Sequence, residues 1–541
     1  MSEKSSREQI ASMLPHCVAD WAEREPERRA LTFVHVDDSG ALVEETRSYG
    51  QLWDNGRRLA QLMKDTGMRR DDHFAIMMQN HPEFVDAMVA SGVSDTIFVC
   101  IDPRVQGDSL RFMLEFAECK GIVIADYALP QLQKILPDLG MLRWIWVVAT
   151  SPTFKLPVGL PNGALVSDLL EIPVPDLEIS ARDPSAPMTL LYTSGTTGDP
   201  KAIMTPYSRM GVIAGLGDML GMGAGNVLYT GLSLTHANAQ LITLGNALWH
   251  GSHGVISRRF TKSRLWDICR AYDCTQFNLL GGMTTAIYSE PVRPNDADNP
   301  VQRVLSAGMP AGIWKQFEQR FNLRVYEFYG TAEGGLTFNP PDVGPIGSVG
   351  KPPPNMIAKV VDGNDDEVPP GEHGELVFKN ADGSTPHVEY YKLPEASVEK
   401  TRGGWFRTGD IFYADEDGWL YFVHRIGDAI RSSGDFIDPN VIQKILAEHP
   451  DIDDVFVYGI PAESGVPGEK DVVAAVVPVS SDVEPARLFA YCRQHLSGNF
   501  VPKYIQFMKE IPKTASEKPQ VRFCIDAFNA ELGTVYTESM Q

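Results

Sequence analysis

The sequence predicts an α/β protein with three parts: a large N-terminal domain built on parallel sheets, a small β-rich subdomain, and a smaller α/β domain at the C-terminus. Short apolar runs alternate with amphipathic stretches in the first part, and short strands separated by Asp-Gly turns follow between Val325 and Val423. A strand and helix alternation returns after Arg425. The 541 residues also exceed a single hydrophobic core, which stops growing at about 250–300 residues.

In the first part, continuous apolar runs bounded by polar residues predict buried strands, and helical apolar spacing predicts helices. The expected strands cover residues 74–78, 97–100, 122–125, 144–149 and 188–193. Helices are expected from Pro82 and over 109–119. Strands that alternate with helices in this way form a parallel sheet covered by helices.

The two later parts follow from the same signals. Strands 357–361, 375–378 and 419–423 are separated by Asp-Gly turns and predict a small β-barrel-like subdomain. The C-terminal part predicts helices over 439–448 and 484–496, with strands over 455–459, 472–479 and 505–508. We place the boundary after Ile426, which gives domains 1–426 and 427–541.

Composition and charge exclude several classes of protein. The net charge of −22, from 48 basic and 70 acidic residues without any Lys/Arg run, excludes a nucleic-acid or anionic-membrane binder. No apolar run is long enough to span a bilayer, and no apolar targeting segment is seen near the N-terminus. The seven Cys are widely spaced without a Cys-x-x-Cys pair, which predicts reduced thiols and a cytoplasmic protein. A homodimer is compatible with the sequence, which does not fix the oligomeric state.

One segment concentrates phosphate-binding residue types directly after a predicted strand. It reads Leu190-Leu-Tyr-Thr-Ser-Gly-Thr-Thr-Gly-Asp-Pro-Lys201. Its glycines allow backbone amides to approach an anion, its hydroxyls donate hydrogen bonds, and its lysine adds charge. The candidate phosphate-binding residues are Thr193, Ser194, Gly195, Thr196, Thr197, Gly198 and Lys201. The pattern is not a Walker-type P-loop, because Pro200 precedes the lysine and Ala202 follows it.

This segment resembles the phosphate-loop signature of the adenylate-forming superfamily, which includes the acyl-CoA synthetases. Further motifs similar to those of the superfamily follow in order along nearly the whole chain, from Ser48 to Lys518. The chain as a whole is faintly similar to the crotonobetaine/carnitine-CoA ligase branch. The resemblance implies the acyl-CoA synthetase fold, with a mobile C-terminal domain.

The resemblance assigns a nucleotide site to several motifs. In Tyr326-Glu-Phe-Tyr-Gly-Thr-Ala-Glu-Gly334, it implies that Tyr329 faces adenine, Thr331 contacts the α-phosphate and Glu333 binds Mg²⁺. It also implies that Asp410 and Arg425 hold the ribose. Phe328 and Gly330 of the same motif are further nucleotide-site candidates. Gly308 and Met309 are candidates in Ser306-Ala-Gly-Met-Pro310, which resembles the strand end that passes beside the adenine.

The C-terminal motifs carry the catalytic lysine and the coenzyme A channel in this resemblance. In Ile511-Pro-Lys-Thr-Ala-Ser-Glu-Lys518, spacing from Pro512 favours Lys518 over Lys513 as the mobile catalytic lysine. Arg431 and Gly434 match the segment at the pantetheine channel. Two positions depart from the family pattern: Gly427 stands at the hinge, and Glu517 precedes the lysine.

The implied reaction is an AMP-forming acid–CoA ligation with ATP, Mg²⁺, coenzyme A and a small-molecule carboxylic acid. Lys518 and a Mg²⁺ ion held by Glu333 would neutralise the two anions that react, and His236 would stand at the acyl pocket. Two alternatives stay open. The acyl acceptor could be the pantetheine of a carrier protein, or the chain could be a nucleotide-binding regulatory protein that has lost catalysis. The sequence does not name the acid.

Overall fold

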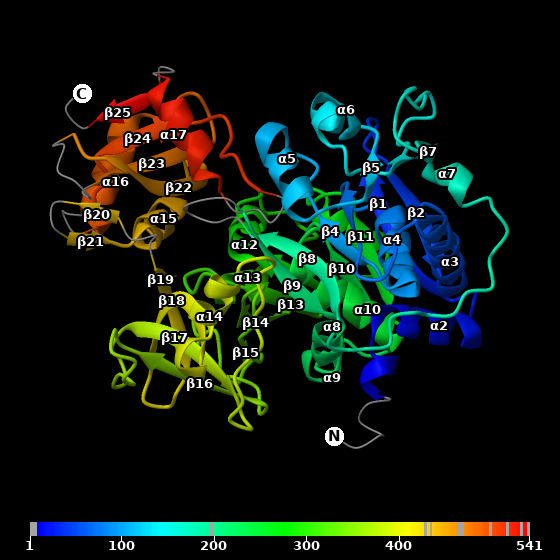
Figure 1. Cartoon of the computed structure of the whole chain (residues 1–541). Coiled ribbons are helices and arrows are strands. Elements are labelled where there is room, and N and C mark those ends of the chain that lie inside the picture. Colours follow the sequence, from blue (N-terminus) through cyan, green and yellow to red (C-terminus); the bar gives the residue numbers. More distant parts are fainter. Residues whose placement is uncertain are drawn as a thin grey trace.

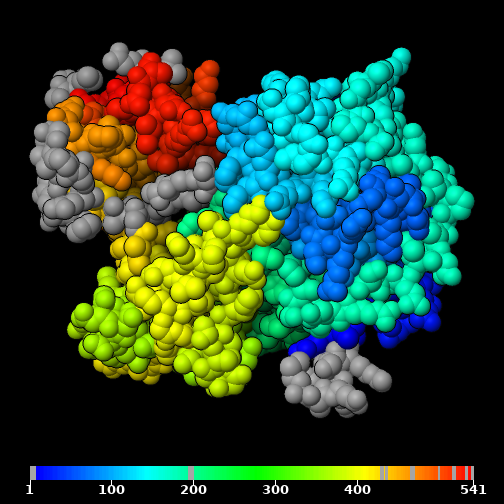
Figure 2. Space-filling model, viewed as in Figure 1, coloured from blue at the N-terminus to red at the C-terminus, as the bar shows by residue number. Residues whose placement is uncertain are grey.

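The computed structural model describes residues 8–193, 200–426, 430–432, 435–463, 470–496, 500–514, 519–530 and 534–537. Figure 1 shows the elements from β20 onward, in orange and red, as a group of their own beside the large N-terminal part. Figure 2 shows the yellow β-rich part and the orange and red C-terminal part against the same side of the blue and green body. Among the described residues, no helix combines the length and the apolar character that a bilayer span requires.

The first large sheet has seven strands in the order β7-β6-β5-β3-β4-β8-β9, and every neighbouring pair except β8 and β9 is parallel. Its strands are β3 (His73–Met77), β4 (Ile97–Cys100), β5 (Gly121–Ala125), β6 (Trp144–Val148), β7 (Ala164–Leu165), β8 (Pro187–Thr193) and β9 (Lys201–Pro206). Helices α5 (Gly107–Phe116), α6 (Leu129–Ile135) and α7 (Val166–Leu169) connect these strands. The predicted strands of this region are confirmed to within one residue.

The second large sheet has eight strands in the order β15-β14-β13-β12-β10-β11-β1-β2, parallel from β14 to β1. Its strands are β1 (Arg29–Val36), β2 (Leu42–Ser48), β10 (Val227–Thr230), β11 (His253–Ser257), β12 (Gln276–Leu280), β13 (Arg303–Ala307), β14 (Arg324–Gly330) and β15 (Leu336–Asn339). The alternating pattern that begins at Val325 predicts residues 325–339 as part of the β-rich subdomain. They belong to this sheet, because β14 pairs with β13 in parallel.

The helices of the N-terminal part cover both sheets. One hydrophobic cluster includes residues of β1, α4 and β12, and α4 is buried along almost its whole length against α2 and α3. Helix α3 begins at a capping box in which Ser48 and Gln51 bond each other's backbone amides. The bounds are α2 (Leu14–Arg24), α3 (Tyr49–Asp65), α4 (Pro82–Ser94), α8 (Tyr207–Ala214), α9 (Gly217–Leu220), the π-helix η2 (Asn238–Leu244), α10 (Gly245–His250), α11 (Leu265–Ala271), α12 (Gly281–Tyr288) and α13 (Trp314–Phe321).

The β-rich subdomain is an antiparallel sheet in the order β16-β17-β18-β19. Its strands are β16 (Met356–Val361), β17 (Gly374–Asn380), β18 (Phe406–Ala414) and β19 (Leu420–Arg425), with helix α14 (Pro394–Lys400) before β18. An isolated bridge between Ile203 and Tyr390 ties the segment before α14 to β9 of the first sheet. The subdomain is thereby fixed against the strand that follows the predicted phosphate loop.

The C-terminal part has its own sheet, in the order β22-β23-β24-β25, with a hydrophobic cluster on each face. The elements are β20 (Ile430–Ser432), β21 (Asp435–Ile437), α15 (Pro439–Ala447), β22 (Ile452–Pro461), β23 (Lys470–Pro478), α16 (Pro485–His495), β24 (Tyr504–Phe507), α17 (Val521–Asn529) and β25 (Val535–Thr537). The predicted helices and strands are present here. Residues 427–429 lie outside the described residues, so the domain boundary stays a prediction.

Candidate active site

Parallel strands of both large sheets end at the candidate site. Strands β10, β12, β13 and β14 run parallel, so their carboxyl ends share one edge of the second sheet. The predicted residues His236, Gly308 and Tyr329 come at or after these ends. Thr193, the first residue of the predicted phosphate loop, is the last residue of β8 in the first sheet. Ligands of α/β proteins bind outside the carboxyl ends of parallel strands.

The predicted phosphate loop connects two antiparallel strands. The backbones of Thr193 and Lys201 pair at the mouth of this hairpin. The candidates Ser194, Gly195, Thr196, Thr197 and Gly198 lie outside the described residues. The Lys201 ammonium lies 5.5 Å from the ring centroid of Tyr390, whose hydroxyl donates to Glu333 Oε1 at 2.8 Å. Tyr390 therefore contacts both the predicted phosphate-binding lysine and the predicted metal ligand.

The turn after β14 presents Glu333. Thr331 closes this turn, since its hydroxyl donates to the Gly334 carbonyl at 2.9 Å and accepts from the Gly334 amide at 3.2 Å. The Thr331 hydroxyl thus serves the turn itself, and its contact with an α-phosphate stays a prediction. Gly330, the last residue of β14, precedes the turn.

Glu333 fits the role of a magnesium ligand. Burial raises the pKa of its carboxyl, but the positive charge of Lys400 and the hydrogen bond from Tyr390 outweigh burial and bring the pKa below its ordinary value. An ionised carboxylate oxygen is a ligand that Mg²⁺ prefers. In the described part of the chain, no group of three or more His, Cys, Asp or Glu could hold a metal. One carboxylate together with substrate phosphates is a usual way to bind Mg²⁺.

Asp410 on β18 joins Tyr329 and the partly exposed Arg425 into a polar triad. The Tyr329 hydroxyl donates to Asp410 Oδ2 at 2.6 Å, and Arg425 Nε donates to Oδ1 at 2.8 Å. The Asp410 side chain is only 5% exposed. Burial, followed by the negative charge of Asp410, raises the pKa of Tyr329 well above its ordinary value, so this phenol stays protonated as a donor. Three predicted nucleotide residues from three strands therefore meet in direct contact.

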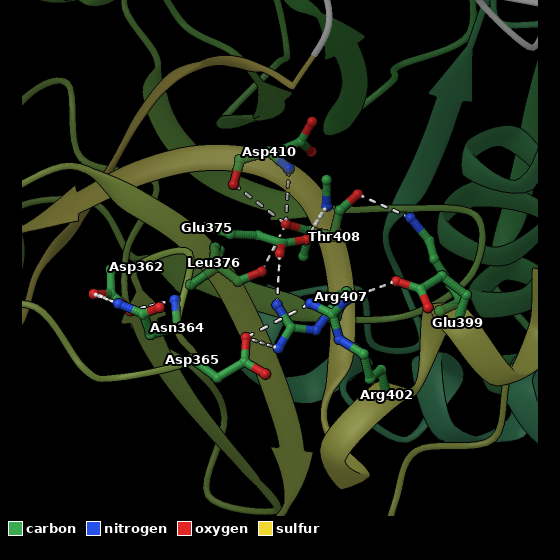
Figure 3. A network of polar contacts seen from close by, with 12 residues as sticks. Asp362, Asn364, Asp365, Glu375, Leu376, Glu399, Arg402, Arg407, Thr408 and Asp410 are labelled. Atoms are coloured by element: carbon green, nitrogen blue, oxygen red, sulfur yellow. Dashed lines mark hydrogen bonds and ion pairs between the residues drawn. The ribbon is translucent and has the colours of Figure 1, made fainter.

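Further polar contacts hold the part of β18 that carries Asp410 (Figure 3). Glu375 on β17 accepts from the Gly409 amide at 2.9 Å and from Arg407 at 2.9 Å. Arg407 also pairs with Asp365. The Thr408 hydroxyl donates to the Leu376 carbonyl at 2.7 Å and accepts from the Asp410 amide at 3.1 Å. These bonds fix the backbone on both sides of Gly409, whose φ of +77° favours glycine.

The loop after β13 lies close to the first residue of α12, Gly281. A Cβ on Gly281 would lie 2.6 Å from the Gly308 carbonyl oxygen, and Gly308 itself has a φ of +101°. The amides of Gly308 and Met309 donate to the carboxyl group of Glu327 on β14 at 2.6 and 3.1 Å. The side chain of Phe328 packs in a hydrophobic cluster with Leu336 and Phe338. Because side chains alternate along a strand, Phe328 faces away from the side on which Tyr329 lies.

Amide side chains organise the predicted acyl side of the site around His236. Asn80 donates to the Leu232 and Ser257 carbonyls at 2.8 Å and accepts from the Leu234 amide at 2.8 Å, which fixes the segment before His236. Asn278 on β12 donates to Asn238 and accepts from Thr243 at 2.9 Å, both on η2. π-Helical turns are frequent at functional sites.

Two cations beside Glu333 were missed by the sequence analysis. Arg209 on α8 donates to the Thr331 carbonyl at 2.8 Å, and Lys400 on α14 donates to the Thr408 carbonyl at 3.1 Å. Burial lowers the pKa of Arg209 to about 10, although the negative charge of Glu333 acts to raise it. Arg209 therefore stays cationic at neutral pH. For Arg209 the one signal in the sequence was a lone charged residue in α8, and that pattern does not point to a ligand.

The predicted catalytic lysine belongs to a loop whose two ends meet. Lys513 and Pro519 pair as an antiparallel bridge, and Arg104 Nη1 donates to the Lys513 carbonyl at 2.8 Å. Arg104 follows the carboxyl end of β4, the parallel neighbour of β8. Lys518 itself lies outside the described residues, as do Glu517, Gly427 and Gly434. Arg431 belongs to β20, and its side chain is not described.

Two protein-family models match the chain. A family model described as AMP-binding enzyme matches residues 18–385, and one described as AMP-binding enzyme C-terminal domain matches residues 442–518. A medium/long-chain-fatty-acid–CoA ligase of Mycobacterium marinum is 29% identical over 497 residues, covering 90% of this chain and 93% of that protein.

Two solved structures show the fold. The crystal structure of an anthranilate CoA ligase with anthranoyl-AMP has a TM-score of 0.81 at 19% identity, covering 96% of this chain and 98% of that one. An o-succinylbenzoate–CoA synthetase of Bacillus subtilis, with ATP and a magnesium ion, has a TM-score of 0.74 at 23% identity, covering 93% and 98%. The likeness confirms the predicted fold class: a large α/β N-terminal domain and a smaller C-terminal domain.

Proposed function

Since the chain belongs to the AMP-binding enzyme family, we propose that it is an AMP-forming acid–CoA ligase. It activates a carboxylic acid with ATP to an acyl-adenylate and pyrophosphate, and then transfers the acyl group to the thiol of coenzyme A. The observation that carries this proposal is the meeting of Tyr329, Asp410 and Arg425 beside Glu333, next to the hairpin of the predicted phosphate loop.

The first half-reaction requires two anions to approach each other. A carboxylate oxygen attacks the α-phosphorus of ATP, and the bond from that phosphorus to the bridging oxygen breaks as pyrophosphate leaves with the electron pair. Lys201 and the loop amides would hold the departing pyrophosphate, and Lys518 would lie between carboxylate and α-phosphate. Asp410, acceptor-only and fixed by Tyr329 and Arg425, would hold the ribose hydroxyls.

The second half-reaction requires a thiol at the same acyl carbon. The sulfur attacks that carbon, the carbon–oxygen bond to the phosphate breaks, AMP leaves, and the thiol proton passes to solvent. We propose that the C-terminal domain turns about Gly427 for this step, removing Lys518 and bringing Arg431 and Gly434 toward the pantetheine arm. A glycine hinge accepts a large change in φ and ψ without Cβ strain.

Glu333 would hold Mg²⁺ together with phosphate oxygens of the nucleotide. Bound there, the ion neutralises charge on the phosphate chain. Tyr390 and Lys400 keep the Glu333 carboxylate oriented and ionised, and Arg209 adds a fourth positive group, with Lys201, Lys400 and Arg425, to this part of the site.

The acid is not fixed by these observations. The relatives named above act on aliphatic or aromatic acids according to their names. We propose that the acyl pocket lies along residues 236–240, 278–283 and 330–337, with His236 at its mouth. Asn238 and Asn278 would give it polar groups that can orient an acyl chain.

Acid-dependent exchange of labelled pyrophosphate into ATP tests the first step. A panel of short, medium, aromatic and steroidal carboxylates should contain an acid that supports exchange and, with coenzyme A, gives a thioester. If exchange occurred but a thioester formed only with a carrier protein, the carrier protein would be the acyl acceptor in place of coenzyme A. Nucleotide binding without exchange for any acid would favour the regulatory protein.

We also propose a cytoplasmic location and a homodimer. All seven cysteines are buried free thiols, which supports a reducing compartment. Fractionation of the source cells tests the location, and light scattering at several protein concentrations tests the dimer.

A further inference from the structure

Glu327 has a buried carboxyl group and lies in the strand that carries Tyr329, the residue predicted to face adenine. It lies in β14, two residues before Tyr329, and its backbone is paired with Ser306 of β13. Its two oxygens accept from the amides of Gly308 and Met309 at 2.6 and 3.1 Å. The residue is 2% exposed. Glu327 therefore connects the strand of Tyr329 to the loop that approaches it from β13.

The groups of the described residues that favour the charge of Glu327 are neutral donors, the amides of Gly308 and Met309 and the Ser306 hydroxyl, and not basic side chains. No basic side chain of the described residues forms an ion pair with it, and the groups that face it are the Ser306 hydroxyl from β13 and Asn339, its cross-strand partner on β15. Burial raises the pKa of Glu327 to about 8, while the two backbone amides and the Ser306 hydroxyl act in the opposite direction. The carboxyl group therefore titrates near pH 8, without a charged partner among the residues that the structure describes.

The two protonation states satisfy the Gly308 and Met309 amides differently. An ionised carboxylate is acceptor-only and serves both amides at once. A protonated carboxyl group carries one donor, which must find an acceptor and turns one oxygen away from its amide. A buried amide left without its acceptor is costly, and the loop that carries it becomes less well held.

We propose that Glu327 is a positioning residue for the nucleotide, whose ionised carboxylate holds the Gly308–Met309 segment in the conformation that receives adenine beside Tyr329. The inference rests on the proposed function, because it takes the nucleotide to bind at this edge. Glu327 itself does not touch the nucleotide. It acts through the two backbone amides.

The test compares AMP binding by E327Q and by the wild-type enzyme, using equilibrium dialysis with labelled AMP between pH 6.5 and 9.5. Glutamine keeps the shape but offers one carbonyl oxygen to two amides. Loss of a hydrogen bond to a charged acceptor predicts about tenfold weaker AMP binding by E327Q at pH 9. The ratio of the two affinities should fall toward one below pH 7, because the wild-type carboxyl group is then protonated.

A matched control is E318Q. Glu318 on α13 is also buried and accepts a backbone amide of β14, that of Val325 at the opposite end of the strand. E318Q should leave the AMP affinity and its pH dependence unchanged. A ratio of wild-type to E327Q affinity that is flat with pH, or an equal loss in E318Q, would overturn the inference.

Failure of this inference is distinguishable from failure of the proposed function. If the wild-type enzyme bound no AMP, the proposed function would fail first. If it bound AMP and ligated an acid while E327Q behaved like the wild type, only the role of Glu327 would be wrong. If E327Q does not fold, AMP affinity is measured against pH for the wild type and for E318Q. A change in AMP affinity near pH 8 in both proteins supports the proposal, and its absence rejects it.

Discussion

The Tyr329 hydroxyl donates to Asp410 Oδ2 at 2.6 Å, across the junction between the eight-stranded sheet and the β-rich subdomain. Asp410 also accepts from Arg425, so its carboxylate is already oriented before a ligand binds. The aromatic residue predicted to face adenine thus also positions the carboxylate predicted to hold the ribose. The two ends of a nucleoside would be recognised by one rigid unit.

Replacing Tyr329 with phenylalanine should weaken AMP binding. Y329F keeps the aromatic face and removes only the donor to Asp410. A hydrogen bond to a charged group contributes about 1.5–3 kcal/mol, so we expect at least about a tenfold rise in the AMP dissociation constant. Calorimetric titration measures it, and Y413F, in a stacked pair with Tyr421, is the control. Equal affinities of Y329F and wild type would show that Asp410 needs no help from Tyr329.

Glu333 can be separated from nucleotide recognition by its magnesium dependence. E333Q keeps the hydrogen-bonding shape toward Tyr390 but removes the charge that would bind Mg²⁺. We expect pyrophosphate exchange to fall about a hundredfold and to need more Mg²⁺, while AMP binding without metal is not weakened. A Mg²⁺ titration of exchange and metal-free dialysis of AMP measure the two effects. An unchanged Mg²⁺ requirement would reject Glu333 as the metal ligand.

Arg209 should affect the adenylation chemistry through its positive charge. Its guanidinium donates once, to the Thr331 carbonyl, and its other N–H groups donate to none of the residues that the structure describes. R209Q should slow exchange by about tenfold or more, and R209K should recover part of the rate, since it keeps the charge without the fork of donors. Initial rates at saturating ATP and acid measure this. A loss in R209K as large as in R209Q would assign Arg209 to turn geometry instead.

The sequence predicted most of the fold because apolar runs such as 97–100 and 472–479 are strands buried on both faces, and their residues identify them without tertiary information. It failed at β14 and β15, where an alternating pattern suggests a separate antiparallel subdomain. The two strands do pair antiparallel with each other, but β14 also pairs in parallel with β13 and so brings both into the large sheet. Which sheet a strand joins depends on contacts between distant segments, and the local pattern does not contain them.

The residues of the candidate site fall into two groups, those that a local motif predicts and those that it does not. Asp410 and Glu333 stand in dense local motifs and were predicted. Arg209, Lys400 and Glu327 were not, because each acts through a residue of another element: Thr331, Thr408 and Gly308. A lone charged residue in a helix or strand gives no sign of such a partner.

Glu327 should also leave a mark on stability against pH. Its folded-state pKa of about 8 lies above the ordinary 4.5. The stabilisation from the neutral buried form is therefore fully present below pH 4.5 and is lost as pH rises through about 8. Between pH 5 and 8 the melting temperature of the wild type should fall relative to that of E327Q, which has no proton to lose. If the melting temperatures of the wild type and E327Q changed equally with pH over this range, Glu327 would already be ionised at low pH.

Arg104 links the N-terminal part to the loop that carries the predicted catalytic lysine, so its removal should affect one half-reaction. Arg104 is held by Asp102 and donates to the Lys513 carbonyl, at one end of the 513–519 bridge. R104A should slow adenylation by about fivefold, the cost of an exposed hydrogen bond, and leave thioester formation from supplied acyl-adenylate unchanged.

K518A should abolish adenylation and spare the second step in the same assay. R111A is the control for R104A, because Arg111 on the adjacent helix pairs only with Asp108 and Asp138 among the described residues. Separate assays of pyrophosphate exchange and of thioester formation from synthetic acyl-adenylate measure both steps. If R104A slowed the two steps equally, the contact would serve general stability. If K518A slowed the two steps equally, another lysine of the C-terminal domain would be the catalytic one. Lys513 would be the first alternative, and its ammonium pairs with Asp454 at 2.5 Å.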